Sequence, residues 1–189
     1  MLKFPFQIVL GSQSPRRKEL LSLMNIDFRV EVQEVEESYP ENLTPVEIAT
    51  HIASKKAKAF KGLSANELLI TADTIVWFNN KALNKPKDFQ EACSMLTELS
   101  GNKHEVYTGV SITSHKKQVS FFVKTVVYFK TLTQEEIEYY VTNYKPYDKA
   151  GAYGAQDWIG LIAVERFEGS YFNVMGLPVK ELYEHLKDF

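Results

Sequence analysis

The sequence predicts a mixed α/β fold, in which helices flank a β-sheet that contains both parallel and antiparallel strands. In the first part of the chain, short apolar runs alternate with helical patterns, which is typical of strands connected through helices. In the later part, long strand-like runs follow each other across short turns, which is typical of hairpins. The 189 residues are 44% hydrophobic and 24% charged, which is enough apolar material for a core and excludes a disordered chain.

The first segment predicts a strand, a small polar loop and a helix. Residues 6–10 form a short apolar run that is typical of a buried strand. Pro15 stands at the first position of the helix, where its missing N–H costs nothing, and Ser14 before it is suited to the N-cap. Residues 28–32 alternate like a second strand, and an acidic loop follows at residues 34–41.

The next segment predicts a second helix and a hairpin. Thr44 and Glu47 have the spacing of a capping box, so a helix begins here and extends to about residue 60. Residues 68–78 predict a strand that is interrupted at residues 72–74. The turn signal Asn79-Asn80 after it predicts a hairpin.

One further helix and a pair of strands follow. Asp88 is suited to cap a helix that continues to Leu99, and Gly101 provides a stop. Residues 105–130 contain two strand-like runs joined near residues 114–117, which predicts an antiparallel pair.

The last part begins with a capping box at residues 133–136, which predicts a helix to about residue 143. A glycine-rich segment follows at residues 148–156. Residues 159–167 predict a strand, and residues 178–186 predict a closing helix.

The composition excludes several classes of function. A net charge of −2 argues against a protein that coats nucleic acid, because such proteins have a basic surface. Cys93 is the single cysteine, so no internal disulfide can form. The sequence has no apolar run of membrane-spanning length and no signal peptide at its start, and the histidines lack zinc-site spacing. We expect a cytoplasmic protein with no nucleic-acid or membrane partner.

The loop at residues 11–17 is a candidate anion site. It contains Ser12 and Ser14, and it leads into a helix whose first turn carries Arg16 and Arg17. Free amides at a helix start bind anions, and guanidinium groups match phosphate geometry. Cations at a helix N-terminus oppose the macrodipole, so a purely structural sequence would favour acids there. The alternative is a solvated arginine pair, and the sequence does not separate the two.

Lys56 is the second candidate, because it lies on or beside the apolar stripe of its helix. It follows Ile52 by four residues and Ala53 by three, so it shares their face. A lysine on a core-facing side either extends its amine to the edge or meets an anion in a cleft. The first outcome is commoner. The stripe also predicts that Lys56→Met leaves folding stability unchanged or raised.

Asp73 is the third candidate, because it lies within an apolar strand pattern. A carboxylate in such a run must be paired, hydrated or metal-bound. The alternative is an aspartate in a turn or bulge that bonds its own backbone.

Weaker candidates add cations, carboxylates and a glycine-rich wall. They are Lys85 in a loop, one of Glu34, Glu36 and Glu37 as a ligand for a divalent cation, and the glycine-rich residues 148–156. No serine–histidine–aspartate or cysteine–histidine set is evident. Together these residues suit hydrolysis of a phosphoanhydride by metal-activated water. Without any resemblance to a family, they indicate only a protein that binds and hydrolyses a phosphate ester.

These residues together resemble the Maf family of nucleotide pyrophosphatases over residues 8–186. The motifs that carry the resemblance occur in one order at compatible spacing. They are Ser12-Gln13-Ser14-Pro15-Arg16-Arg17, Glu37, Lys56-Ala57, Ala72-Asp73-Thr74-Ile75-Val76, Lys85-Pro86, Asp148-Lys149-Ala150-Gly151-Ala152-Tyr153-Gly154, Gly169-Ser170-Tyr171 and Gly176-Leu177-Pro178. Gly11 stands where the family often has alanine.

The resemblance implies a fold and an activity. The fold is a Maf/inosine triphosphate pyrophosphatase-like mixed, elongated sheet flanked by helices, with two lobes around a cleft, and residues 1–189 are expected to form a single domain. The activity is hydrolysis of dTTP, UTP and modified uridine triphosphates to the monophosphate and pyrophosphate. It requires a divalent cation, Mg²⁺, Mn²⁺ or Co²⁺. The resemblance also implies a homodimer and a role in inhibition of septum formation.

The resemblance also implies residue roles. Asp73 is implied to be the catalytic residue, and Glu37 and Asp73 are implied to bind the metal. Whether Asp73 acts as the base, as a metal ligand or as both stays open. The residues implied to bind phosphate are Ser12, Ser14, Arg16, Arg17, Lys56 and Lys85, and those implied to select the base are Arg17, Thr74 and Gln156. The competing interpretations are a non-catalytic nucleotide-binding regulator of cell division and a nucleic-acid-binding module, and the acidic balance disfavours the second.

Overall fold

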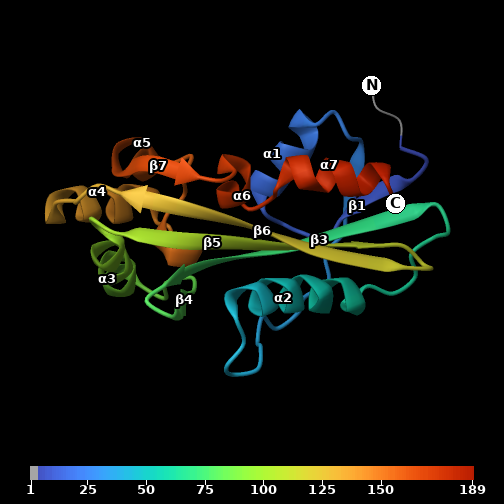
Figure 1. Ribbon diagram of the computed structural model, residues 1–189, viewed down its shortest axis with the longest axis horizontal. Coiled ribbons are helices and arrows are strands. Elements are labelled where there is room, and N and C mark those ends of the chain that lie inside the picture. Colours follow the sequence, from blue (N-terminus) through green and yellow to red (C-terminus); the bar gives the residue numbers. More distant parts are fainter. Residues whose placement is uncertain (1–3) are drawn as a thin grey trace. The chain divides into compact units, whose positions relative to one another are not determined.

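A seven-stranded mixed sheet organises the fold, which the computed structural model describes for residues 4–189 (Figure 1). The strand order is β2-β1-β3-β5-β6-β7, with β4 paired to β3. β1 runs parallel to both β2 and β3, whereas β4 is antiparallel to β3 and β7 is antiparallel to β6. The predicted mixed α/β class is therefore confirmed. Residues 1–3 of the predicted single domain lie outside the described residues.

The strands and helices follow the predicted order with few exceptions. The strands are β1 (Gln7–Leu10), β2 (Phe28–Val30), β3 (Glu67–Phe78), β4 (Lys81–Leu83), β5 (Lys103–Thr113), β6 (Gln118–Phe129) and β7 (Val164–Glu168). The helices are α1 (Pro15–Leu23), α2 (Pro45–Ala59), α3 (Phe89–Leu99), α4 (Gln134–Tyr144), α5 (Trp158–Ala163), α6 (Tyr171–Met175) and α7 (Val179–Lys187), with a short 3₁₀ turn at Ala150–Ala152.

The predicted helix starts are confirmed by their hydrogen bonds. Thr44 and Glu47 form the capping box of α2, and Thr133 and Glu136 form that of α4. The Asp88 side chain caps α3 by accepting from the Glu91 N–H at 2.8 Å. Ser14 occupies the N-cap position of α1, but its side chain makes no capping bond.

Two predictions about strands are wrong. β3 is continuous from Glu67 to Phe78, so residues 72–74 do not interrupt it. Residues 158–163 form helix α5, and the strand begins only at Val164. An apolar run of this length fits a buried helical turn as well as a strand, and periodicity alone cannot separate them.

The predicted hairpin after β3 is confirmed. Asn79 and Asn80 have φ values of 48° and 59°, and the register pairs Phe78 with Lys81. Two left-handed residues form the turn whose twist matches a β-hairpin, and asparagine tolerates that conformation better than most side chains.

The chain divides into two compact units. The first consists of the residues up to Asp73 together with Thr108–Val123 and Gly176–Phe189, and the second consists of Thr74–Tyr107 and Lys124–Met175. Each unit is therefore assembled from segments that are far apart in the sequence. Among the described residues, none of the helices is both long and apolar enough to cross a membrane.

Helix α2 packs closely on the sheet of the first unit, where α1 and α7 lie on the opposite face (Figure 1). Its predicted apolar stripe is buried, and Ala57 joins Val9 and Leu69 in one cluster. A Cβ built on Gly109 would lie 2.4 Å from the Ala49 carbonyl oxygen, so only glycine permits this approach.

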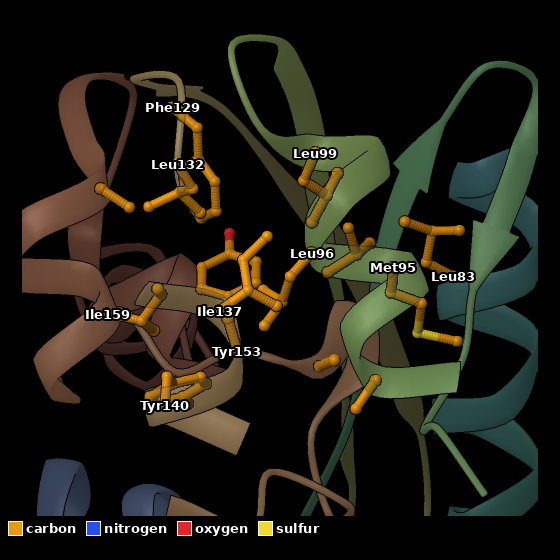
Figure 2. Packing of buried hydrophobic residues seen from close by; sticks show 14 of the residues in the cluster. Leu83, Met95, Leu96, Leu99, Phe129, Leu132, Ile137, Tyr140, Tyr153 and Ile159 are labelled. Atoms are coloured by element: carbon orange, nitrogen blue, oxygen red, sulfur yellow. The ribbon is translucent and has the colours of Figure 1, made fainter. Parts of the chain in front are cut away.

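The second unit has its own apolar core (Figure 2). Side chains from α3, α4 and the 3₁₀ segment meet there around Leu96, Tyr140 and Tyr153. Tyr153 lies edge-on to both Phe129 and His104, with ring centroids 5.0 Å and 5.3 Å away.

His104 is a buried polar group inside this aromatic cluster. Its Nε2 shares a 2.7 Å hydrogen bond with the Tyr153 hydroxyl, and the side chain is 1% exposed. Burial lowers the pKa of His104 from its ordinary value of 6.5 to about 3, because the imidazolium would lose its hydration there. The folded protein therefore holds this ring neutral.

This pKa predicts a specific loss of stability in acid. Because the folded-state pKa is depressed, the unfolded chain takes up the proton first, so stability falls as pH decreases from 6.5 toward about 3. The slope from this group is about 1.4 kcal/mol per pH unit. The free energy of unfolding should be measured with denaturant between about pH 7 and about pH 5 for the Tyr153→Phe variant and for the His104→Phe/Tyr153→Phe double variant. We expect this free energy to change less with pH in the double variant. Equal slopes would contradict this assignment.

Candidate active site

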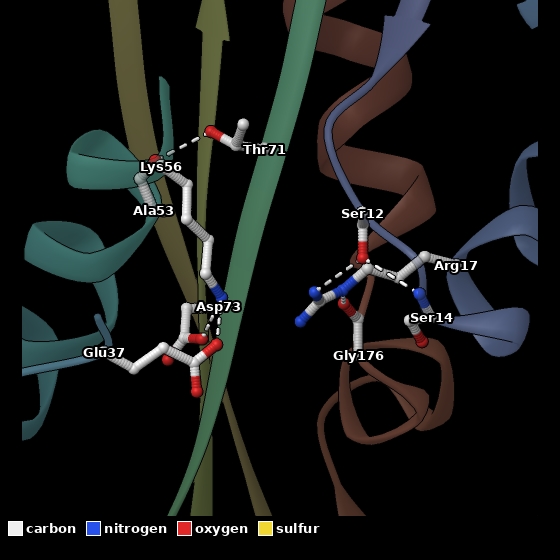
Figure 3. Close-up of polar contacts among 9 residues, drawn as sticks. All are labelled: Ser12, Ser14, Arg17, Glu37, Ala53, Lys56, Thr71, Asp73 and Gly176. Atoms are coloured by element: carbon white, nitrogen blue, oxygen red, sulfur yellow. Dashed lines mark hydrogen bonds and ion pairs between the residues drawn. The ribbon is translucent and has the colours of Figure 1, made fainter. Parts of the chain in front are cut away.

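The start of α1 holds an arginine in a fixed position (Figure 3). Arg17 Nε donates to the Gly176 carbonyl oxygen at 2.8 Å, and Arg17 Nη1 donates to Ser12 Oγ at 3.2 Å. Ser12 Oγ also accepts from the Ser14 N–H at 3.2 Å. Ser12 is buried and Arg17 is half-buried. Arg17 is therefore not a freely solvated side chain.

The electrostatics of this helix start are dominated by cations. The first turn carries no acid, and Arg16 lies beside Arg17. Burial lowers the pKa of the Arg17 guanidinium, the carboxylates of Asp73 and Glu37 oppose that shift, and Arg16 adds to it. Cations at a helix N-terminus oppose the helix dipole, and an anion bound there would offset the unfavourable interaction.

Lys56 lies between two carboxylates (Figure 3). Its Nζ is 2.7 Å from Glu37 Oε1 and 2.8 Å from Asp73 Oδ1. The side chains of Lys56 and Asp73 are 16% and 11% exposed, whereas Glu37 is 40% exposed. The two carboxylates thus converge on one point at the edge of a buried region.

The packing of α2 on β3 explains how these groups meet. Thr71 Oγ1 donates to the Ala53 carbonyl oxygen at 2.7 Å, which ties the strand to the helix. Asp73 follows Thr71 by two residues and therefore points to the same face of β3. The stem of Lys56 runs along the strand from the level of Ala53 toward Asp73 (Figure 3).

The acidic loop is held by two successive lysines of α2. Lys56 pairs with Glu37, and Lys55 Nζ donates to the Ser38 hydroxyl at 2.9 Å. Of the three glutamates that the sequence left open, Glu37 is the one that pairs with Lys56, while Glu34 and Glu36 are exposed.

Asp73 differs from an aspartate in a turn, because it lies in a continuous strand and is 8% exposed. Burial raises the pKa of Asp73, and Lys56 and Arg17 oppose the shift. A raised pKa brings a carboxylate closer to the range in which it can accept a proton from water during a reaction.

Glu37 and Asp73 fit a divalent cation that is only partly coordinated by protein. In residues 4–189, no cluster of three or more His, Cys, Asp or Glu side chains is arranged for a metal ion. Two carboxylates that already face one positive charge suit Mg²⁺, which takes its other ligands from substrate phosphates and water.

Three of the predicted site residues belong to the second unit. Thr74 begins this unit and shares a face of β3 with Val76, and Lys85 is exposed in the loop after β4. The loop is tied to the glycine-rich segment, because the Gly151 N–H donates to the Asn84 carbonyl oxygen at 3.3 Å. Gly151 has a φ of 67°, and a Cβ there would lie 3.0 Å from the Val76 side chain.

Gln156 ends the glycine-rich segment, and the two polar atoms of its side-chain amide differ in their hydrogen bonding. Its Nε2 donates to Asp157 Oδ1 at 3.2 Å. Its Oε1 is buried and accepts no hydrogen bond within the described part of the chain. A buried amide oxygen without a donor is unfavourable, and a ligand that supplies an N–H would satisfy it.

Sequence reasoning missed two contributors. The Gly176 carbonyl oxygen accepts a hydrogen bond from Arg17. The sequence indicated an unusual backbone there only through the glycine itself, which has a φ of 108° just before Leu177-Pro178. Asp157 contacts Gln156, and the strand that the sequence predicted at residues 159–167 hid its place before helix α5.

Comparison with known proteins finds relatives that match nearly the whole chain. The family model described as Maf-like protein matches residues 7–189. A protein of Parabacteroides distasonis named dTTP/UTP pyrophosphatase is 52% identical over 186 residues, covering 97% of this chain and 96% of that protein. Proteins with the same name from Bacteroides fragilis and Flavobacterium johnsoniae are 51% and 48% identical, each over 96% of this chain and 95% and 94% of their own lengths.

Among solved structures, a HAM1 protein from Coxiella burnetii has a similar fold. The TM-score is 0.53 at 16% sequence identity, and the match covers 97% of this chain and 100% of that one. At this identity the likeness concerns the fold alone.

The ion pairs change what Lys56→Met should do. Removing the ammonium leaves Asp73 buried beside Glu37 with less compensation, so we expect a loss of about 1–3 kcal/mol at neutral pH, between the values for exposed and buried pairs. The loss should shrink as pH falls, because the protonated carboxyls no longer repel each other. Denaturant unfolding at several pH values measures this.

Lys55→Met provides the matched control, because Lys55 is the neighbouring lysine and its bonds to Ser38 are exposed. It should change stability by less than about 0.5 kcal/mol. If Lys56→Met is as stable as Lys55→Met at neutral pH, the bridge does not stabilise the fold.

Proposed function

We propose that this chain, which belongs to the Maf family, hydrolyses dTTP and UTP to the nucleoside monophosphate and pyrophosphate. Relatives that carry this activity in their names match nearly the whole chain at about half identity. The structural observation that supports it most is the buried Asp73, held by Lys56 and close enough to Arg17 for their charges to interact.

The cations bind the triphosphate in this proposal. Arg16 and Arg17 at the start of α1, with Lys56 and Lys85, neutralise the phosphate tail that would otherwise repel a nucleophile. Hydrogen bonds to the Gly176 carbonyl and the Ser12 hydroxyl hold the Arg17 guanidinium in a fixed orientation, which suits directed hydrogen bonds to phosphate. Ser12 and Ser14 shape the loop so that it passes close to the phosphates.

Asp73 accepts the proton of the attacking water. The water oxygen bonds to the α-phosphorus, the bond from that phosphorus to the bridging oxygen breaks, and pyrophosphate leaves with its charge offset by the cations. Lys56 has three N–H donors, so it can contact a phosphate while it still holds Asp73. Burial of Asp73 favours its role as the base, because it raises the pKa of the carboxyl.

Glu37 and Asp73 are the residues that would hold Mg²⁺, Mn²⁺ or Co²⁺. A divalent cation bound there would polarise the phosphate oxygens and lower the pKa of bound water. Lys56 keeps the two carboxylates converged before substrate arrives, so the ligand pair is already assembled.

Gln156, with Arg17 and Thr74, selects the base. Uracil and thymine present an N3–H between two carbonyl groups, and the unpaired Gln156 Oε1 is an acceptor for that N–H. Cytosine has an acceptor at the same ring position, so it would leave two acceptors facing each other. Such a buried mismatch costs about 1–3 kcal/mol.

We extend the proposal to the setting of the enzyme. Residues 1–189 act as one functional domain, because the family model spans both compact units. A homodimer in the cytoplasm and a role in septum formation are expectations of the family resemblance. The alternative, a nucleotide-binding regulator without turnover, differs from the enzyme in a single measurement, the release of pyrophosphate.

Asp73→Asn should keep nucleotide binding and lose about 100-fold or more of its turnover, because the amide cannot accept the proton from water. Release of pyrophosphate from UTP and dTTP, with Mg²⁺, Mn²⁺ or Co²⁺, measures this against the unaltered protein. A protein that binds UTP but releases no pyrophosphate with any of these cations would favour the regulator. Near-normal turnover by Asp73→Asn would remove Asp73 as the base.

Gln156→Ala should reduce the preference for UTP over CTP more than it reduces hydrolysis of CTP. The comparison is the ratio of kcat/KM for UTP to that for CTP in both proteins. We expect the ratio to fall by about tenfold, in line with one lost buried hydrogen bond. An unchanged ratio would exclude Gln156 from base selection, and a preference of the unaltered enzyme for GTP would overturn the proposed substrate.

A further inference from the structure

We propose that Asp157 is a positioning residue that fixes which end of the Gln156 amide faces the base, and thereby sets the preference for uracil and thymine. The inference rests on the proposed function, and it concerns how specificity is imposed at the glycine-rich segment of the second unit. Its evidence is the geometry of the Asp157 carboxylate.

Both oxygens of Asp157 are engaged by fixed donors. Oδ1 accepts from Gln156 Nε2 at 3.2 Å, and Oδ2 accepts from the Tyr140 hydroxyl at 2.7 Å. Lys149 Nζ lies 3.6 Å from Oδ2, and the Asp157 side chain is 16% exposed. Tyr140 is fully buried and also accepts from the Gly154 N–H at 3.2 Å. The carboxylate is thus anchored at one oxygen and presents the other to Gln156.

Asp157 also departs from the ordinary use of its position. It is the N-cap residue of α5, yet its side chain makes no capping bond. Aspartate at an N-cap usually accepts from a helix N–H, and that bond stabilises the helix. Here the carboxylate is directed to Tyr140 and Gln156 instead, which indicates a different role for it.

Gly154 provides the space that this arrangement needs. A Cβ at this position would lie 2.6 Å from Asp157 Oδ2 and 2.9 Å from Gln156 Nε2. Any side chain at residue 154 would therefore displace the carboxylate, the amide or both.

The chemistry of the carboxylate then determines the amide orientation. A carboxylate only accepts hydrogen bonds, so the NH₂ end of Gln156 must face Asp157. The carbonyl end is left as the buried, unpaired Oε1. An amide held this way reads an N–H donor such as N3–H of uracil or thymine, and it opposes the N3 acceptor of cytosine.

An amide in place of the carboxylate should reverse this polarity. In Asp157→Asn, the oxygen of the substituted side chain can keep the Tyr140 and Lys149 contacts, so its NH₂ would face Gln156 and draw the Gln156 oxygen toward it. The Gln156 NH₂ would then face the base, where it matches cytosine N3. We expect the ratio of kcat/KM for UTP to that for CTP to fall by about tenfold or more.

Asp157→Ala separates this effect from structural damage. Without a partner at residue 157 the amide can adopt either orientation, so its UTP-to-CTP ratio should lie between those of the unaltered enzyme and Asp157→Asn. A purely structural role predicts the opposite order, because alanine removes more packing than the isosteric asparagine. Tyr140→Phe is the matched control, because it breaks the same network yet leaves an acceptor toward Gln156, so the ratio should stay near that of the unaltered enzyme.

A double variant tests whether Asp157 acts through Gln156. In a Gln156→Ala background, Asp157→Asn should leave the UTP-to-CTP ratio unchanged, because there is no amide to reorient. Independent, multiplicative effects would overturn the inference, as would a ratio for Asp157→Asn equal to that of the unaltered enzyme. If the unaltered enzyme hydrolyses neither UTP nor dTTP, the proposed function itself fails.

Discussion

The contact between the Lys56 ammonium and the carboxylates of Glu37 and Asp73 joins a helix, a strand and a loop of the first unit. Asp73 lies in a buried strand and Lys56 on a core-facing helix, so neither charge is tolerable without the other. The loop around Glu37 forms neither helix nor strand. The same contact holds this acidic loop to α2. One ammonium therefore fixes a strand, a helix and a loop at a single point.

This constraint depends on backbone packing that contains no charge. Gly109 lets α2 approach the sheet, and Thr71 ties β3 to the Ala53 carbonyl. With the helix fixed at this distance, the stem of Lys56 has a defined path to Asp73. A larger side chain at residue 109 would push α2 away, so a change in the middle of a strand would act on the charge network of the site.

The sequence predicted the elements well where local chemistry decides them. Capping boxes at Thr44 and Thr133 and the Asn79-Asn80 turn identify boundaries, because the same side chains that mark them also make the hydrogen bonds. It failed at residues 158–163, where tertiary packing decides between helix and strand. For the site, the sequence identified Lys56 and Asp73 as charged residues on apolar faces. It could not predict their ion pair, because the two residues lie on different elements and no local pattern connects them. Asp157 was missed because the strand predicted at residues 159–167 hid its position before helix α5.

Both units retain polar groups that a sequence chosen for stability alone would avoid. Within residues 4–189, Gln156 Oε1 is buried without a donor, and the Asp157 side chain makes no capping bond to α5 while it accepts from the Gln156 amide. Arg16 and Arg17 occupy a helix start with no acid in the first turn, and the pKa of Asp73 is raised by burial. In the first unit an anion at the start of α1 would offset the positive charges there, and in the second unit an N–H donor would satisfy the Gln156 oxygen. Departures of this kind are typical of sites that bind a ligand, because a sequence selected only for folding stability would remove them. We therefore infer that each unit, taken by itself, keeps less than its greatest stability for the sake of recognition.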